Sequence, residues 1–135
     1  MPVNVGTRRR LKDPELFPEF FFAAVVVVEQ AKNTDGNLAA EVFSAENGVN
    51  WTRTGWLDRG PLQEFVGREP HLSTMAHIDN LCDEATLVDR EQSSRSLPDG
   101  QTSFDRLVAD GQVATLSDGT EAHRTRAFPA PVETP

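Results

Sequence analysis

Two histidines are the first candidates for chemistry in this sequence. His71 and His77 lie six residues apart, so on a continuous helix they would point roughly 120° away from each other and are poorly placed to bind one metal ion together. His71 follows Pro70 and is expected to begin a helix, whose positive end lowers the proton affinity of an imidazole. A neutral imidazole at this position suits a general base or a ligand, and a surface or capping histidine is the alternative.

Aromatic and apolar side chains could form a pocket beside this histidine. The candidates for binding a flat apolar molecule are Phe21, Trp51, Trp56, Phe65 and Met75. Trp51 and Trp56 fall on opposite faces of one expected strand, so one can line a pocket while the other packs in the core, or both can be packing residues. Arg53 shares the face of Trp51. If it is buried it needs an anionic partner, either a carboxylate or a ligand, and if it is exposed it is a solvated charge.

A run of three arginines, Arg8-Arg9-Arg10, stands out in an otherwise acidic chain. Arg8 and Arg10 share one face of an expected strand and could hold an anionic ligand through bidentate contacts. Salt bridges to acidic residues are the alternative. Three basic residues are only a weak sign of nucleic-acid binding.

The overall composition indicates one soluble domain without nucleic-acid or membrane partners. The 135 residues, 38% of them hydrophobic, are enough for one core, and the net charge of −8 disfavours binding to nucleic acid or anionic membranes. The longest apolar stretch, residues 20–28, is much shorter than the roughly 20 residues of a membrane span. The first twelve residues lack the apolar run of a secretory signal. We therefore expect a cytoplasmic protein. The acidic, lysine-poor composition is typical of halophilic proteins, and a high-GC genome, which favours arginine over lysine, is the alternative explanation.

Cysteine and metal chemistry are not indicated. Cys82 is the only cysteine, which excludes an internal disulfide bond. Its neighbours Asp83 and Glu84 are expected to raise its pKa, which argues against a nucleophile. No group of cysteines and histidines has the spacing of a zinc site.

Periodicity and turn residues predict a β-α-β-β-α-β order, the split βαβ of a ferredoxin-like α+β fold. The expected strands are residues 1–11, 37–43, 49–57 and 85–93. The expected helices are residues 15–32, a second helical region interrupted at residues 68–70 and resumed over 71–81, and a short helix over 103–109. A late hairpin arm from Val113 and a proline-rich tail would follow.

The segment from Glu15 to Lys32 is ambiguous on propensity alone. Its four successive valines, residues 25–28, favour a strand. A capped start at Asp13-Pro14 and a stop at residues 33–36 favour a helix, which we expect to be deeply buried, with Phe21 and Val25 widening its apolar face. On the sheet, Leu38, Val42, Trp51 and Leu87 are candidates for an apolar face that a second copy of the chain would cover.

The stretch Trp51-Thr52-Arg53-Thr54-Gly55-Trp56-Leu57-Asp58 resembles the third strand of the antibiotic-biosynthesis-monooxygenase-like superfamily, which often carries Trp-Thr-x-Ser/Thr-x-Trp-x-Asp there. Leu62, Phe65 and His71 resemble the apolar-x-x-Phe helix and the histidine that follow it. Residues 97–107 resemble an extension of the related DUF3291 group. The resemblance covers residues 1–110 and implies a dimeric α+β-barrel domain, with residues 111–135 as a C-terminal extension and tail.

The resemblance implies a homodimer and leaves the reaction open, since one fold can carry several functions. The first hypothesis is a monooxygenase-like protein that oxygenates a flat apolar substrate without a cofactor, with His71 as the base. A non-catalytic dimer that binds a ligand or has a structural role is the alternative. A heme-binding protein is the second alternative, because His77 resembles the axial histidine of the heme-degrading branch. That branch also uses a first-strand asparagine and a second-helix tryptophan, where this chain has Arg8 or Arg10 and Phe65.

Overall fold

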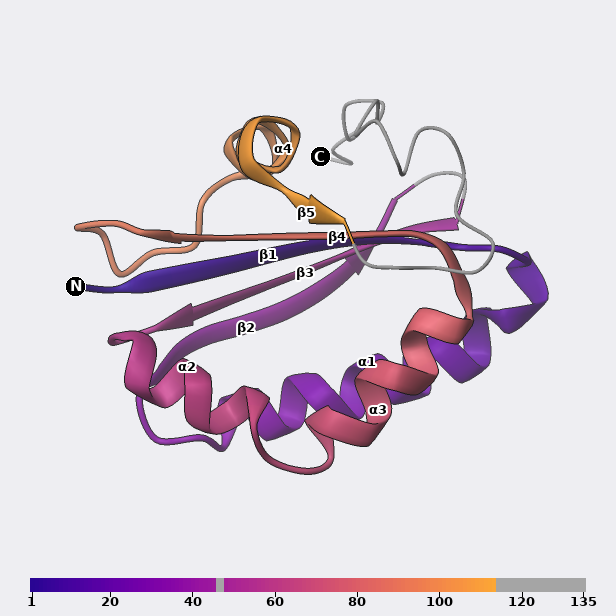
Figure 1. Ribbon diagram of the computed structural model, residues 1–135, viewed down its shortest axis with the longest axis horizontal. Coiled ribbons are helices and arrows are strands. Elements are labelled where there is room, and N and C mark those ends of the chain that lie inside the picture. Colours follow the sequence, from indigo (N-terminus) through magenta and orange to yellow (C-terminus); the bar gives the residue numbers. More distant parts are fainter. Residues whose placement is uncertain (46–47, 114–135) are drawn as a thin grey trace.

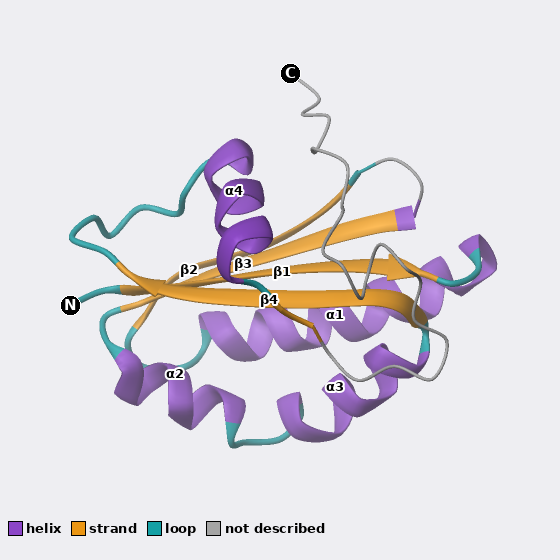
Figure 2. Cartoon of the chain, turned by 45° about the horizontal axis from the view of Figure 1, so that its top comes forward, coloured by secondary structure: helices purple, strands orange, loops and turns teal. Residues whose placement is uncertain are grey.

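The computed structural model describes residues 1–45 and 48–113 (Figure 1). Its elements are β1 (Val3–Leu11), a short 3-10 helix η1 (Pro14–Leu16), α1 (Phe17–Lys32), β2 (Asn37–Ser44), β3 (Val49–Trp56), α2 (Arg59–Val66), α3 (His71–Asn80), β4 (Cys82–Glu91), α4 (Gly100–Asp110) and β5 (Gln112–Val113). The strands form one antiparallel sheet in the order β2-β3-β1-β4-β5. Helices α1, α2 and α3 cover one face of the sheet, and α4 lies on the opposite face (Figures 1 and 2).

This arrangement confirms the predicted α+β class and the ferredoxin-like β-α-β-β-α-β order from β1 to β4, with α2 and α3 together as the second helical region. The break between α2 and α3 falls where it was expected, and α3 begins at His71. Strand β4 begins three residues earlier than predicted, because its pairing with β1 extends to Cys82 opposite Leu11. The expected hairpin turn includes residues 46 and 47, and most of the late hairpin and the whole tail fall in residues 114–135, so these lie outside the described part of the chain.

Helix α1 forms despite its four valines. Asp13 accepts a hydrogen bond from the backbone N–H of Glu15 at 2.9 Å and starts the preceding η1 turn. The buried residues of α1 recur at helical spacing and pack under the sheet: Phe20, Ala23, Ala24, Val28 and Ala31. Burial of this stripe outweighs the strand propensity of residues 25–28. The prediction that Phe21 and Val25 extend the buried face of the helix was wrong, because they are 46% and 37% exposed.

The core is divided between the two faces of the sheet. On the side of α1, α2 and α3, two clusters form around Trp56 with Phe65 and around Phe20 with Ile78. On the opposite side, Leu107 of α4 joins a third cluster with Trp51, Val49 and Val88. Helix α4 is held at its start by Asp99, which accepts a hydrogen bond from the backbone N–H of Thr102 at 2.7 Å.

Leu38, Val42, Trp51 and Leu87 were expected to share one uncovered apolar face, and this was wrong for Val42 and Leu87, which lie on the opposite face from Trp51. Val42 packs against the cluster of α1 and α3, and Leu87 lines a cavity on the same side, because both stand in register with Thr7 and Thr52. Trp51 points the other way and is only 2% exposed in the cluster that contains Leu107 of α4. Within the described residues, no helix has the length and hydropathy required to cross a membrane.

Candidate functional site

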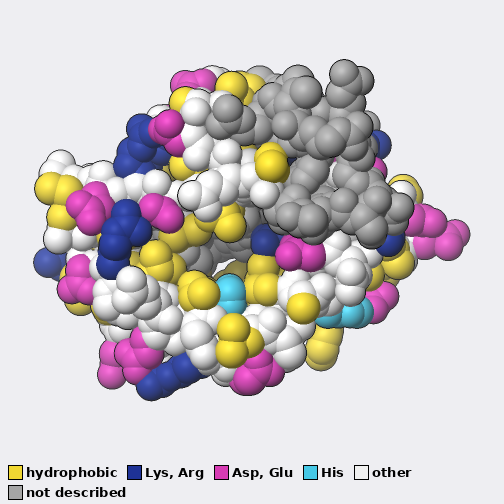
Figure 3. Space-filling view, in the orientation of Figure 1, with side chains coloured by type: hydrophobic (Ala, Val, Ile, Leu, Met, Phe, Trp, Pro, Cys, Tyr) yellow, Lys and Arg dark blue, Asp and Glu magenta, His cyan; other side chains and the backbone are white. Residues whose placement is uncertain are grey.

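A cavity of about 620 Å³ lies between the sheet and the helices α1, α2 and α3. Figure 3 shows a hollow in the middle of one face of the molecule, with hydrophobic side chains and a histidine at its edge. Most of the lining side chains are apolar, among them Phe20, Val27, Leu62, Phe65, Met75 and Ile78. The volume is within the range of roughly 300–1,000 Å³ that is usual for small-molecule sites.

The strands contribute polar groups to this apolar cavity. Because side chains alternate along a strand, Val5, Thr7 and Arg9 of β1 all face the cavity. Thr52 lies opposite Thr7 on β3, and the two hydroxyls hydrogen-bond to each other. The sheet wall therefore presents hydroxyls, the guanidinium of Arg9 and the carboxylate of Asp89 to any molecule bound there.

His71 is the first residue of α3 and lines the cavity. Its ring lies edge-on to the ring of Phe65, with centroids 4.7 Å apart. Its Nδ1 atom is buried and has no hydrogen-bond partner in the part of the chain that the structure describes. A buried polar atom without a partner is uncommon in a folded protein, which makes His71 a candidate for a functional role.

The surroundings of His71 favour the neutral imidazole. Burial lowers the pKa of His71 below its ordinary value, and the positive charge of Arg9 lowers it further. The backbone of Val66 and the carboxylate of Glu69 act in the opposite direction on this pKa without reversing the shift. A neutral imidazole can accept a proton, so His71 has the protonation state that a general base needs.

Arg9 is a cavity residue that the sequence analysis did not single out. It is 9% exposed, its Nη1 donates a hydrogen bond to Thr7 Oγ1 at 3.2 Å, and its Nε lies 3.6 Å from Asp79 Oδ1. The sequence did indicate its direction, because Arg9 is an even number of residues from Val3, Val5 and Thr7 and so shares their side of the strand.

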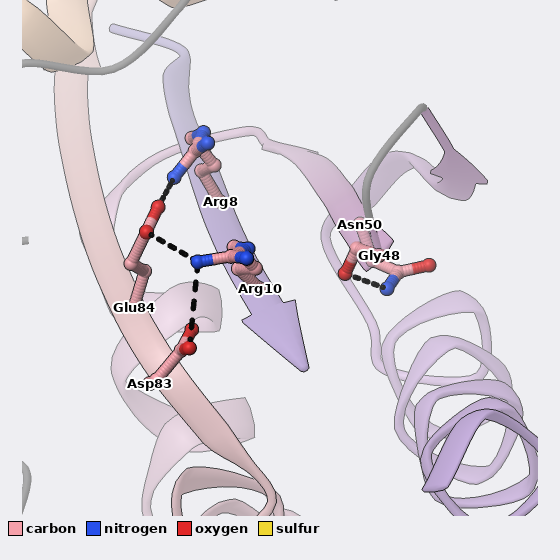
Figure 4. Close-up of polar contacts among 6 residues, drawn as sticks. All are labelled: Arg8, Arg10, Gly48, Asn50, Asp83 and Glu84. Atoms are coloured by element: carbon pink, nitrogen blue, oxygen red, sulfur yellow. Dashed lines mark hydrogen bonds and ion pairs between the residues drawn. The ribbon is translucent and has the colours of Figure 1, made fainter. Parts of the chain in front are cut away.

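Arg10 and Arg8 lie on the opposite side of β1 from the cavity and pair with carboxylates of β4 (Figure 4). Arg8 Nη1 lies 2.6 Å from Glu84 Oε1 in a buried pair. Arg10 Nη1 donates hydrogen bonds to Asp83 Oδ2 at 3.4 Å and to Glu84 Oε2 at 3.3 Å. Arg8 and Arg10 therefore form salt bridges, which was the alternative to binding an anionic ligand.

Trp51 and Arg53 also lie outside the cavity, on the face that carries α4. Trp51 stacks on Phe43 with centroids 6.3 Å apart. Arg53 lies over the Phe43 ring, its Nη2 is 2.5 Å from Glu41 Oε1, and its Nη1 donates a hydrogen bond to the Pro98 carbonyl at 2.6 Å. The anionic partner that a buried Arg53 requires is therefore a carboxylate of the neighbouring strand.

Two further candidates, Trp56 and Phe21, differ in their relation to the cavity. Trp56 is fully buried and stacks on Phe65 with centroids 5.0 Å apart, so it supports a lining residue without lining the cavity itself. Phe21 stacks on Phe17 at the surface of α1. The structure thus brings Phe65, His71 and Met75 together at the cavity and places both tryptophans elsewhere.

The surroundings of His77 do not fit the axial heme ligand of the second alternative. His77 is a surface residue of α3, its side chain is 49% exposed, and its Nε2 lies 2.8 Å from Glu19 Oε1. Among residues 1–45 and 48–113, no three histidine, cysteine or acidic side chains are grouped closely enough to hold a metal ion. Burial raises the pKa of the Cys82 thiol to about 12, so it is not a nucleophile at neutral pH.

The chain has the fold of solved structures that are described as antibiotic biosynthesis monooxygenases. Rv0793 from Mycobacterium tuberculosis is similar with a TM-score of 0.64 and 17% identity, over 71% of this chain and 99% of the other. A putative antibiotic biosynthesis monooxygenase from Deinococcus radiodurans has a TM-score of 0.62 and 14% identity, over 70% of this chain and 94% of the other. A variant of SnoaB, a cofactor-independent oxygenase from Streptomyces nogalater, has a TM-score of 0.61 and 11% identity, over 73% of this chain and 98% of the other.

No protein-family model and no curated protein matches the chain by sequence. At identities of 11–17%, the likeness to solved structures establishes the fold alone. The reaction has to be argued from the cavity.

Proposed function

We propose that the protein binds a flat, largely apolar molecule in the cavity and oxygenates it with O₂ and without a cofactor. The observation that carries this proposal is the position of His71 in the wall of a largely apolar cavity, with its Nδ1 atom unpaired among the described residues. The fold adds support, because SnoaB, which shares it, is named a cofactor-independent oxygenase.

The chemistry requires a substrate with an activated CH₂ group between an aromatic ring and a conjugated carbonyl system. His71 takes one proton from this carbon, and the resulting carbanion is delocalised over the rings. The carbanion supplies the electrons that reduce O₂. Over the whole reaction the CH₂ group and O₂ give a C=O group and water, so the substrate loses four electrons and O₂ gains four.

The cavity would assist by orientation and by exclusion of water. Phe65 and Met75 line the cavity together with His71 and give it apolar surface. A flat molecule held against these side chains would keep its acidic carbon beside the imidazole, which saves the entropy of bringing the two groups together.

The proposal is tested with anthrone, a three-ring ketone with one activated CH₂ group. We expect O₂ consumption with formation of the quinone, and His71→Gln should lower the rate at least about 100-fold, the usual contribution of a general base. His77→Gln is the matched control, because His77 lies outside the cavity. An unchanged rate in His71→Gln would exclude this residue as the base.

A non-catalytic ligand-binding protein is the second candidate. One observation favours it. In many enzymes a third group orients the catalytic base, but within the described residues no carboxylate hydrogen-bonds to His71 Nδ1. Tight binding of the flat quinone without any consumption of O₂ in the presence of anthrone would support this reading. We also propose that the protein acts as a homodimer, as the resemblance implies.

A further inference from the structure

One lining residue of the cavity carries a positive charge that the protein satisfies only in part. Arg9 is 9% exposed and reaches the cavity from β1. A guanidinium has five N–H donors. Among the described residues, the Arg9 guanidinium makes one hydrogen bond, which its Nη1 donates to Thr7 Oγ1 at 3.2 Å.

The nearest carboxylate does not complete this pairing. Asp79 Oδ1 lies 3.6 Å from Arg9 Nε, which is beyond hydrogen-bond distance. Both atoms are buried without a hydrogen-bond partner among the described residues. The Asp79 side chain is 37% exposed, so water screens part of its charge.

The other arginines beside the sheet are paired more completely. Arg53, with a similarly buried side chain, has Glu41 at 2.5 Å and the Pro98 carbonyl at 2.6 Å. Arg59 also lines the cavity, but its side chain is 44% exposed and lies 3.1 Å from Asp89 and 3.3 Å from Glu91. A buried guanidinium that lacks such partners is a site for an anion, because a carboxylate can accept two parallel hydrogen bonds from it.

We propose that Arg9 binds a carboxylate of the ligand and so determines which flat molecules the cavity accepts. The inference rests on the proposed function and names its substrate class: fused aromatic acids rather than neutral polycyclic molecules. Asp79 and His71 lie eight residues apart on α3, or about 12 Å along the helix axis. Two or three fused rings with the acid group at Arg9 would extend from that end of α3 toward His71. Arg9 anchors the molecule, and His71 acts at the other end.

The test compares anthracene-2-carboxylate with anthracene-2-carboxamide, a neutral molecule of the same shape, by fluorescence titration at neutral pH. The wild-type protein should bind the carboxylate at least tenfold more tightly than the amide. Arg9→Met should abolish this preference and leave the affinity for the amide within about twofold. Arg53→Met is the matched control, because Arg53 has similar burial on the opposite face of the sheet, and it should retain the preference.

The outcomes separate this inference from the proposed function. Equal affinities for acid and amide in the wild-type protein, or a preference that persists in Arg9→Met, would overturn the anion site and leave the cavity as a binding site for flat molecules. Failure of both molecules to bind would contradict the proposed function and the inference with it. If Arg9→Met does not fold, Arg9→Lys serves instead. It keeps the charge without the planar pair of donors, so the preference should fall at least threefold, and an unchanged preference would count against the site.

Discussion

The ring of Phe65 meets the imidazole of His71 edge to face, with centroids 4.7 Å apart and planes inclined by 63°. On its other contact, Phe65 stacks on the fully buried Trp56, with centroids 5.0 Å apart. The candidate base is therefore connected to the core of the sheet through one aromatic side chain. Phe65 links the stability of the domain to the position of His71.

Phe65→Ala should consequently affect both stability and function. Loss of this buried ring should lower the free energy of unfolding by about 3–5 kcal/mol. Turnover or ligand affinity should also fall, because the imidazole of His71 loses the ring that holds it in position. Denaturant unfolding and ligand titration measure the two effects. Phe22→Ala is the control, because Phe22 is 74% exposed on α1 and its loss should change stability by no more than about 0.5 kcal/mol. Similar losses in the two variants would show that Phe65 is not a core residue.

The lowered pKa of His71 predicts a pH dependence of stability. Burial is its main cause, with Arg9 acting in the same direction and Glu69 against it. As the pH falls through the ordinary histidine value of 6.5, the unfolded chain takes up a proton before the folded one does. The stabilisation is present above that value and is lost below it. Between about pH 8 and pH 5, the wild-type protein should therefore lose more stability than His71→Gln. Parallel pH profiles of the two proteins would contradict the burial of a neutral imidazole.

Much of the fold could be predicted from the sequence, because its signals were local. Asp13-Pro14 and the stop after Lys32 marked the ends of the first helix, and period-two alternation separated Val3 and Val5 from Arg8. The extent to which α1 is buried could not be predicted in this way. Phe21 and Phe22 have the composition of a core, but only contact with the sheet decides which stripe of a helix becomes buried.

The candidate site was less predictable, because it depends on which residues of distant segments meet. His71, Phe65 and Met75 were proposed together and lie together at the cavity. Arg53 and Trp51 had equally suitable chemistry, but α4 packs on their side of the sheet. Helix α4 follows the predicted six-element unit, so nothing within that unit indicated which sheet face it would cover.

The buried pair of Arg8 and Glu84 provides a test of the electrostatics on that second face. The two side chains are 2% and 5% exposed and lie 2.6 Å apart. Glu84→Gln removes the carboxylate closest to Arg8 in the described structure, within a buried pair, and should cost about 3–5 kcal/mol of stability. Glu64→Gln removes an exposed partner of Arg68 one helical turn away and should cost no more than about 0.5 kcal/mol. Equal, small losses would show that the Arg8–Glu84 pair is accessible to water.

The homodimer is a separate prediction, measured by the mass of the protein in solution. Sedimentation at micromolar concentration should give about twice the chain mass of 14.9 kDa. Because α4 packs on the second face of the sheet, a second copy has to accommodate this helix or use exposed apolar residues such as Phe17, Phe21 and Phe22 on α1. A strict monomer at high protein and salt concentration would contradict the dimer.

The turn between α1 and β2 depends on a glycine that no other residue can replace without strain. Gly36 has φ of +92°, and a Cβ atom added to it would lie 2.4 Å from Cγ of Pro61, at the start of α2. Its carbonyl also accepts a hydrogen bond from the backbone N–H of Leu57 at 2.8 Å, which ties the turn to the end of β3. A side chain would therefore disfavour the backbone conformation and push α2 away from the turn at the same time.

Gly36→Ala should lower the free energy of unfolding by at least about 1–3 kcal/mol, and a shift of α2 should weaken ligand binding through Leu62 and Phe65, which line the cavity from that helix. Gly6→Ala is the matched control. A Cβ atom there would be 3.9 Å from Val88, an ordinary contact, so stability should stay within about 1 kcal/mol of wild type or rise slightly. Denaturant unfolding of both variants decides the matter, because equal stability of Gly36→Ala and Gly6→Ala would mean that the turn tolerates a side chain and does not position α2.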